Sequence, residues 1–332
     1  MIRQAKPSQS LLRRAGSLYV TACDADVEAL KPGNVSINSP GHDMTAADFR
    51  ASARATAEIL VDSRLHLGER VYQSVKATRA VVDCNTNLGV LLLCAPMMQA
   101  MLSVGSTLRL RVLNVLDGLE PRDSERMYAA IRLAAPGGLG TCDQHDVAEP
   151  PSCSLMEAMR VAASRDRVAH QYAYGYADVF GYAVPLLRSL RRRWPQGTWS
   201  LTVLFLMLLA RFPDTHIARK QGAAVAGSVS RAANRLTAHI IQSGPTAKAV
   251  EQVRAMDQEL KSQRVNPGTT ADLVVASVLA LHLEELLDSE REGDDSPTKI
   301  EWSAKRLQRS VCINYPTTEE KRDDDHQSSY DR

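Results

Sequence analysis

The sequence predicts an all-α fold, arranged as a compact multi-helix bundle-like domain. Nearly every long segment repeats its apolar residues with the period of a helix and contains few clusters of β-branched residues. The hydrophobic content is 44% but only 5% of the residues are aromatic, so the core is aliphatic. The alternation of strands and helices that a doubly wound sheet needs is missing. The 332 residues suffice for a large core, in one domain or in two intimately packed ones.

Ten segments carry this helical pattern, and the breaks between them contain proline, glycine or both. The predicted helices cover residues 9–30, 45–64, 69–82, 87–102, 121–134, 153–193, 197–211, 214–242, 245–263 and 269–288. Pro96 lies inside an apolar run, where it is expected to kink the helix and not to end it.

The composition changes near the C-terminus. Residues 1–288 are predicted to form an all-helical domain. After Ser289 charged residues, Ser and Thr dominate, and such a segment cannot bury a core. Residues 289–332 are therefore predicted to be a charged, disordered tail.

Overall charge and cysteine usage limit the class of protein. A formal charge of +2 offers no electrostatic basis for binding nucleic acid or an anionic membrane. Six scattered cysteines without a CxxC pair predict reduced thiols in a cytoplasmic protein. The most apolar run, residues 201–210, is too short to span a bilayer and is expected to form a buried core helix. The oligomeric state stays open.

The first polar cluster joins Lys31–Asn34 to Gly41–Met44. A capping-box signature begins at Thr45, so His42 and Asp43 are expected just ahead of a helix N-terminus. The backbone there favours anions. The alternative is a helix C-cap, a turn and a solvated His–Asp pair.

A second cluster, Asn85-Thr86-Asn87, opens an apolar helix. Asn87 is a good N-cap residue. The two further polar side chains are more than a cap requires, so capping and ligand binding remain equal alternatives.

The third cluster begins at Asp214 and continues through a predicted helix. Thr215 and Arg219 share one face of that helix, as do His216 and Lys220. A carboxylate at this position can hold Mg²⁺, and the two cations can bind phosphate. Alternatively, Asp214 caps the helix and the cations are solvated.

The fourth cluster is the turn before the last predicted helix. Thr269 and Asp272 have the spacing of a capping box. The same turn places the N–H groups and hydroxyls of Thr269 and Thr270 at a helix N-terminus, which is also a way to bind phosphate without a Walker motif.

Taken in order, the four clusters resemble the triphosphoribosyl-dephospho-CoA synthase family, from about Ala22 to about Leu287. No single motif is specific, but their order and spacing are. The matching motifs are Lys31-Pro32-Gly33, Gly41-His42-Asp43-Met44 with Phe49, Asn85-Thr86-Asn87-Leu88-Gly89, Asp214-Thr215 with Lys220 and Gly222, and Pro267-Gly268 with Ala271-Asp272-Leu273.

The resemblance implies an all-helical enzyme that joins ATP to dephospho-CoA. In that family the ribose 2′-hydroxyl of dephospho-CoA attacks the anomeric carbon of ATP, adenine leaves and the triphosphate is retained. Mg²⁺ is expected with ATP, because the triphosphate needs cations. The product is the precursor of the prosthetic group of citrate lyase and malonate decarboxylase carrier proteins.

The resemblance and the residue chemistry together predict three groups of site residues. The catalytic group is Asp43, His42 and Asp214, and the metal group is Asp43, Asp214 and Asp272. The nucleotide- and phosphate-binding group is Lys31, Asn34, Asn85, Thr86, Asn87, Thr215, Arg219, Lys220, Gly222, Thr269 and Thr270. Which aspartate acts as base and which binds metal does not follow from the sequence.

The chain departs from the better-known members of that family. They have His-Lys where this chain has Asn87-Leu88, and they have Asn where it has His216. The chain is more similar to a divergent branch linked to methanopterin-type one-carbon metabolism, so the acceptor can be dephospho-CoA or a related nucleotide-like molecule. Two alternatives follow: a related nucleotide-handling enzyme of that cofactor pathway, or a non-catalytic helical partner protein.

Overall fold

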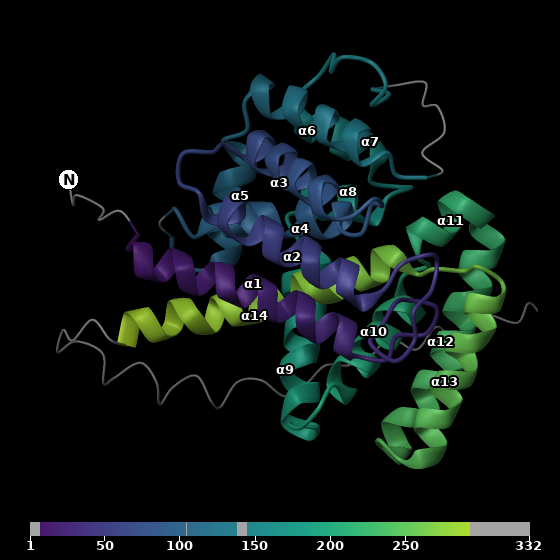
Figure 1. Cartoon of the computed structure of the whole chain (residues 1–332). Coiled ribbons are helices and arrows are strands. Elements are labelled where there is room, and N and C mark those ends of the chain that lie inside the picture. Colours follow the sequence, from purple (N-terminus) through teal and green to yellow (C-terminus); the bar gives the residue numbers. More distant parts are fainter. Residues whose placement is uncertain (1–6, 104, 138–144, 293–332) are drawn as a thin grey trace, which may run out of the picture. The chain divides into compact units, whose positions relative to one another are not determined.

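Helices make up most of the part of the chain that the structure describes (Figure 1). The computed structural model describes residues 7–103, 105–137 and 145–292. Within those ranges there are fourteen α-helices, one π-helical turn and no strand, so the all-α prediction is confirmed. The helices are α1 (Gln9–Glu28), α2 (Ala46–Val61), α3 (Leu67–Val81), α4 (Leu88–Ala100), α5 (Leu108–Asp117), α6 (Pro121–Ala134), α7 (Leu155–Ala162), α8 (Arg167–Ala173), α9 (Val184–Arg193), α10 (Trp199–Arg211), α11 (Thr215–Gln221), α12 (Ala223–Ser243), α13 (Ala247–Ser262) and α14 (Gly268–Glu292).

Three helices supply the centre of the core. Helices α4 and α10 are apolar on almost every face, and nearly all of their residues are buried. Most of α14 between Ala271 and Leu287 is buried as well. A helix that is hydrophobic all round must be covered on all sides. The amphipathic helices provide that cover.

The surrounding helices pack in pairs, some between sequence neighbours and some between more distant helices. Helix α1 lies along α2, α2 along α3, and α3 along both α4 and α6 (Figure 1). Helices α9 and α12 pack on α10, and α13 packs on α12. Residues 1–289 form one compact unit. The start of α4 and the start of α14 both lie in this unit, where they can share a cavity.

Pro96 lies inside α4 and does not end it, as expected. Proline has no N–H, so the carbonyl of Leu92 loses its helical hydrogen bond. The hydroxyl of Tyr172 donates to this carbonyl at 2.7 Å, and the hydroxyl of Tyr176 donates to Leu93 at 2.9 Å. Both tyrosines are buried. The aromatic stripe is thus part of the core and compensates for the proline.

Replacing Tyr172 by Phe should destabilise the fold by about 1–3 kcal/mol, because the buried Leu92 carbonyl is left unsatisfied. Chemical denaturation measures this change. The control is Tyr72→Phe, whose hydroxyl makes no hydrogen bond within the described residues and whose loss should stay within about 0.5 kcal/mol. Equal stability of the two variants would contradict this account of α4.

Several predicted helix boundaries are wrong. The segment predicted as one helix over 153–193 is broken into α7, α8, a π turn (Val179–Ala183) and α9. Gly175 and Tyr176 both have positive φ there, which interrupts the helix. The segment 214–242 breaks at Gly222, whose φ is 96°. Helix α5 was not predicted. Helix α14 continues to Glu292, past the predicted boundary at 288, and the rest of the predicted tail, 293–332, lies outside the described residues.

Two other expectations concern the membrane and the thiols. In the described ranges no single helix has the length and hydropathy to cross a bilayer, and only the bent pair α10–α11 meets that test in combination. Helix α10, which contains the apolar run 201–210, is buried as expected. Cys23, Cys84, Cys94 and Cys153 are free thiols.

Candidate active site

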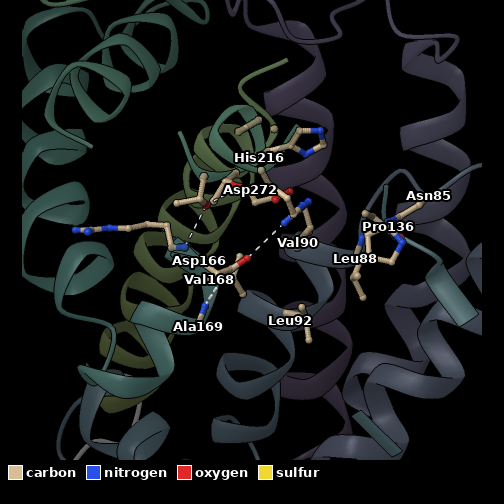
Figure 2. A pocket seen from close by; sticks show the side chains of 18 of the residues that line it. Asn85, Leu88, Val90, Leu92, Pro136, Asp166, Val168, Ala169, His216 and Asp272 are labelled. Carbon is tan, nitrogen blue, oxygen red and sulfur yellow. Dashed lines mark hydrogen bonds and ion pairs between the residues drawn. The ribbon is translucent and has the colours of Figure 1, made fainter. Parts of the chain in front are cut away.

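A cavity of about 1380 Å³ opens where the starts of α4, α8, α11 and α14 converge. Figure 2 shows His216, Asp272 and Asp166 on one side of this cavity and Asn85, Leu88 and Pro136 on the other. Eleven of the fifteen predicted site residues line it: Asn34, His42, Asp43, Asn85, Thr86, Asn87, Thr215, Arg219, Lys220, Thr269 and Asp272. The four sequence clusters therefore meet in one place.

The loop of the first cluster is held against the turn of the fourth. The N–H of Gly33 donates to Asp257 at 2.9 Å, and the Asn34 amide donates to Asn266 at 2.9 Å. Gly33 has a φ of 79°, and a Cβ there would lie 2.8 Å from the carbonyl oxygen of Val265. Only glycine fits this close approach. The Lys-Pro-Gly motif is therefore explained by packing against the α13–α14 connection.

His42 and Asp43 form the tip of a tight turn. Both have positive φ, 57° and 61°, and the backbone groups of Gly41 and Met44 exchange hydrogen bonds across the turn. Two successive positive φ values define a type I′ turn, which strains residues with a side chain. The ring of His42 pairs with the Gly33 carbonyl at 2.8 Å, while the exposed Asp43 carboxylate lines the cavity without a hydrogen bond to any described residue. Backbone strain of this kind is typical of functional sites.

Three helix starts are tied together by hydroxyl and carboxylate groups. The Thr215 hydroxyl accepts from the Arg167 N–H and donates to the Thr269 hydroxyl, both at 3.2 Å. Asp214 caps α11 by accepting from Ile217, and it also accepts from the N–H and the hydroxyl of Thr270, each at 2.7 Å. These bonds fix α8, α11 and α14 around one end of the cavity.

Asp272 lies within the fourth cluster but caps nothing. Its carboxylate lines the cavity and makes no hydrogen bond or ion pair with any described residue, so the capping-box alternative is wrong. The residue opposite is Gly89 in the first turn of α4, where a Cβ would lie only 2.0 Å from Oδ2 of Asp272. The glycine of the second motif therefore makes room for the carboxylate of the fourth.

The surroundings of Asp272 disfavour its charge. Burial raises its pKa well above the usual range, and the carboxylates of Asp214, Asp26 and Asp166 raise it further. Lys31 lowers it, but to a smaller extent. A cation beside Asp272 would offset this repulsion.

Two cations of α11 face the same cavity. Arg219 lies 3.5 Å from Asp166 and donates to the Gly137 carbonyl at 3.3 Å. Lys220 is exposed at the cavity, and its ammonium group has no hydrogen bond or ion pair within the described ranges. Arg219 is thus held in place, whereas Lys220 remains available to a ligand.

Four predicted site residues do not line the cavity, and the prediction that they bind ligand directly needs correction. Lys31 is fully buried and forms an ion pair with Asp26. The oxygens of Asp214 are committed to helix starts, and Thr270 donates to them. Gly222 forms the break between α11 and α12. All four have structural roles behind or beside the site.

Several charged residues at the cavity were not among the predicted site residues. Asp26, Asp166 and Arg167 all line the cavity. Asp166 caps α8 by accepting from Ala169 at 2.9 Å, and Arg167 pairs with Asp178 at 2.8 Å. The Arg-Asp-Arg sequence at 165–167 was a signal, but it was hidden because the whole region was interpreted as one continuous helix.

Asn87 and His216 each keep an unsatisfied polar atom at the cavity, as does Asp26, whose other carboxylate oxygen pairs with Lys31. Nδ2 of Asn87 and Nε2 of His216 are buried without a hydrogen-bond partner among the described residues. Asn87 does not cap α4, because Asn85 accepts from the Leu88 N–H instead and Asn87 accepts from Thr78. Buried polar atoms in native proteins are normally paired. Asn87 and His216 are therefore placed to contact a bound ligand.

Burial lowers the pKa of His216 to about 3, and the nearby Lys220 and Arg219 add to the effect. In the unfolded chain the imidazole of His216 is protonated below its ordinary pKa of 6.5, whereas in the folded chain it stays neutral until the pH approaches 3. The free energy of unfolding is therefore unaffected by the protonation of His216 above pH 6.5, and it decreases as the pH falls from 6.5 towards 3 because protonation favours the unfolded chain. One proton gives a slope of about 1.4 kcal/mol per pH unit in the free energy of unfolding.

Denaturant titrations at several pH values between 6.5 and 4 test this. His216→Asn should be less sensitive to acid than the wild type by up to about that slope. Identical pH dependence of the two proteins would show that the ring is not kept neutral by the fold.

The predicted metal cluster is not formed by the protein alone. In the part of the chain that the structure describes, no three His, Cys, Asp or Glu side chains are grouped to hold a metal ion. The carboxylate of Asp214 accepts hydrogen bonds from the starts of α11 and α14. Of the three predicted metal ligands, Asp43 and Asp272 therefore remain. One or two carboxylates together with phosphate oxygens are the usual ligands of Mg²⁺.

Comparisons with known proteins bear on the fold and the family of the chain. The solved structures include a protein from Archaeoglobus fulgidus, provisionally named a triphosphoribosyl-dephospho-CoA synthase, that superposes with a TM-score of 0.56. It is 23% identical, and the match covers 72% of this chain and 98% of that one, which shows a shared fold. A search of the curated proteins gives no significant match. The profile of the CitG family, ATP:dephospho-CoA triphosphoribosyl transferase, matches residues 12–291, and the chain therefore belongs to this family of enzymes.

Proposed function

We propose that the cavity is the active site for the family reaction and that its two ends bind the two nucleotide substrates. The observation that carries the proposal is the convergence of four helix starts on Asp272, a carboxylate with no hydrogen-bond or ion-pair partner among the described residues. A cavity of about 1380 Å³ is larger than the roughly 300–1,000 Å³ of ordinary small-molecule sites. Two nucleotides need such a space.

The triphosphate of ATP belongs at the start of α14. This 25-residue helix presents Gly268 and Thr269 to the cavity, and its N-terminal N–H groups favour anions. Lys220 lines the same cavity with an ammonium group that has no partner among the described residues, and Arg219 supplies a fixed guanidinium. Phosphate is thereby held by a helix dipole and two cations without a Walker motif.

Asp272 fits the Mg²⁺ that accompanies ATP. Its carboxylate faces the cavity and pairs with none of the residues that the structure describes, and three neighbouring carboxylates make a cation favourable there. When bound, Mg²⁺ would neutralise charge on the triphosphate and on Asp272. The other ligands would come from phosphate oxygens and water.

Asp43 is the general base in this proposal. It is exposed on a rigid turn and has no hydrogen bond to any described residue, so it can accept the proton of the acceptor 2′-hydroxyl. The oxygen then bonds to C1′ of ATP while the C1′–N9 bond breaks. Adenine leaves with that electron pair, and the proton it gains balances the one taken up by Asp43. The triphosphate stays on the transferred ribose.

The direct test is to incubate the protein with ATP, Mg²⁺ and dephospho-CoA and to analyse the products by mass spectrometry. The proposal predicts free adenine and triphosphoribosyl-dephospho-CoA in equal amounts. Formation of ADP, or of AMP with pyrophosphate, would mean that chemistry occurs at phosphorus and would overturn it.

Replacing Lys220 by Met should raise KM for ATP by about 10- to 100-fold with little change in kcat. A charge-assisted contact to phosphate contributes about 1.5–3 kcal/mol, and this contact exists already in the ground state. Steady-state kinetics measures both constants. Lys248→Met, on the exposed surface of α13, is the control and should behave as wild type. A loss confined to kcat would assign Lys220 to the chemical step instead.

A further inference from the structure

One side of the cavity is aliphatic. Helix α7 contributes Leu155, Ala158, Met159 and Ala162 to the lining, and α6 contributes Ile131. Leu155 and Met159 are buried, whereas the two alanines are only partly buried. Together these five residues form what we term the aliphatic wall. None of them takes part in the chemistry proposed above.

The wall has the spacing of one amphipathic helix face. Positions 155, 158, 159 and 162 recur at three- and four-residue intervals, so α7 turns a single apolar stripe towards the cavity. The small alanines keep this side open, because longer side chains at 158 and 162 would fill it. A wall of this kind binds an apolar group of a ligand, while the phosphates of the ligand bind at the polar end of the cavity.

The order of features along the chain and the cavity matches a particular ligand. Helix α7 ends at Ala162, and the lining continues through Ala163 and Ser164 to the charged residues 165–167 at the start of α8. Arg167 is held by Asp178 and stacks on Phe212 at 3.8 Å from the ring centre. The N–H of Arg167 also donates to Thr215, whose hydroxyl bonds to Thr269 at the start of α14. The arginines therefore connect the aliphatic wall to the helix starts where we place the phosphates.

Dephospho-CoA has the same order of chemical groups. Its ribose carries the 2′-hydroxyl, the 5′-diphosphate follows, and the pantetheine arm with its dimethyl group comes last. We infer that the aliphatic wall is the subsite for the pantetheine arm and selects a diphosphate acceptor that carries an aliphatic chain. This inference rests on the proposed function, since it assigns the second substrate to the same cavity.

The wall discriminates against a flat aromatic acceptor. Its five side chains are all aliphatic, and a planar heterocycle such as a pterin gains most from stacking on an aromatic ring. Tyr128, three residues before Ile131 on α6, also lines the cavity, but it is only 2% exposed and its hydroxyl donates to the His145 carbonyl at 3.1 Å, so its ring offers little surface for stacking. An aliphatic arm makes better use of this surface.

Ala158→Leu and Ala162→Leu test the assignment by filling the wall. Leucine is nearly as good a helix former as alanine, so α7 should persist. The matched control is Arg160→Leu, which adds the same side chain to an exposed position of α7 that does not line the cavity. Circular dichroism and thermal unfolding verify that all three variants fold.

Two readouts are measured. In steady-state kinetics, KM for dephospho-CoA should rise by about tenfold or more in both cavity variants, with KM for ATP unchanged. Binding of 4′-phosphopantetheine, which carries the arm without adenosine, should be saturable in the wild type and in Arg160→Leu and weaker by about tenfold in the cavity variants.

The outcomes separate the subsite from the reaction. If wild type transfers triphosphoribose to dephospho-CoA but the cavity variants keep KM for it, the subsite assignment is wrong. Absence of 4′-phosphopantetheine binding to wild type would also overturn it. If wild type binds 4′-phosphopantetheine as described but releases no adenine from ATP, the subsite stands and the proposed reaction fails.

Discussion

Replacing Asp272 by Asn is expected to lower kcat for triphosphoribosyl transfer by about 10²–10⁴-fold. The substitution keeps the shape that fits against Gly89 and removes the charge that would face Mg²⁺ and the triphosphate. Stability should be unchanged or higher, because burial and three nearby carboxylates disfavour the ionised form of Asp272. Such a gain in stability with a loss of activity is typical of a functional residue.

Kinetics and thermal unfolding of Asp272→Asn are therefore measured together. Asp117→Asn, at the exposed end of α5 and outside the cavity, is the control and should change neither quantity. Asp43→Asn should also lower kcat, but without raising the Mg²⁺ concentration needed for half-maximal rate, because Asp43 acts as base in our account. Full activity of the Asp272→Asn variant would show that the charge of Asp272 has no role in the reaction.

Replacing Gly89 by Ala should reduce turnover strongly, by about 10²-fold, although it adds one methyl group in a helix. That methyl would lie 2.0 Å from Oδ2 and 2.6 Å from Cγ of Asp272, so the carboxylate must move. A displacement of this size is enough to misplace a catalytic group. Activity and MgATP affinity are the measurements.

Gly227→Ala in α12 is the matched control. Its nearest neighbour would be the flexible end of Arg231 at 3.4 Å, so alanine fits there. The control should gain roughly 0.5–1 kcal/mol of stability from helix propensity and keep full activity. If both glycine variants are equally active, the absence of a side chain at Gly89 is not needed to accommodate the Asp272 carboxylate.

The helices could be predicted because their apolar residues repeat with helical period and their starts carry caps. The Thr45–Asp48 capping box is present as expected, and so is the Asp214 cap. Helix α5 was missed because Leu108 to Arg111 alternates apolar and basic residues, a pattern of period two that is typical of strands. The breaks within 153–193 depend on positive φ values that no periodicity reveals.

Most of the site could be predicted because its residues stand at helix starts, where polar motifs are visible in the sequence. The errors concern partners that only the tertiary structure supplies. Lys31 has the sequence context of a phosphate ligand, but Asp26 neutralises it inside the core. Asp166 has the sequence context of a surface charge, yet the packing of α8 beside α11 turns it into the cavity. Membership of an enzyme family favours catalysis over the non-catalytic alternative.

The most direct test of the site is a crystal structure of the protein with ATP and Mg²⁺ in the absence of acceptor. Our account predicts the triphosphate against Gly268 and Thr269, with Lys220 in contact with a phosphate oxygen, Mg²⁺ on Asp272 and C1′ of the ribose turned towards Asp43. ATP bound outside this cavity, or bound in it with adenine at the start of α14 and the triphosphate in solvent, would contradict the account.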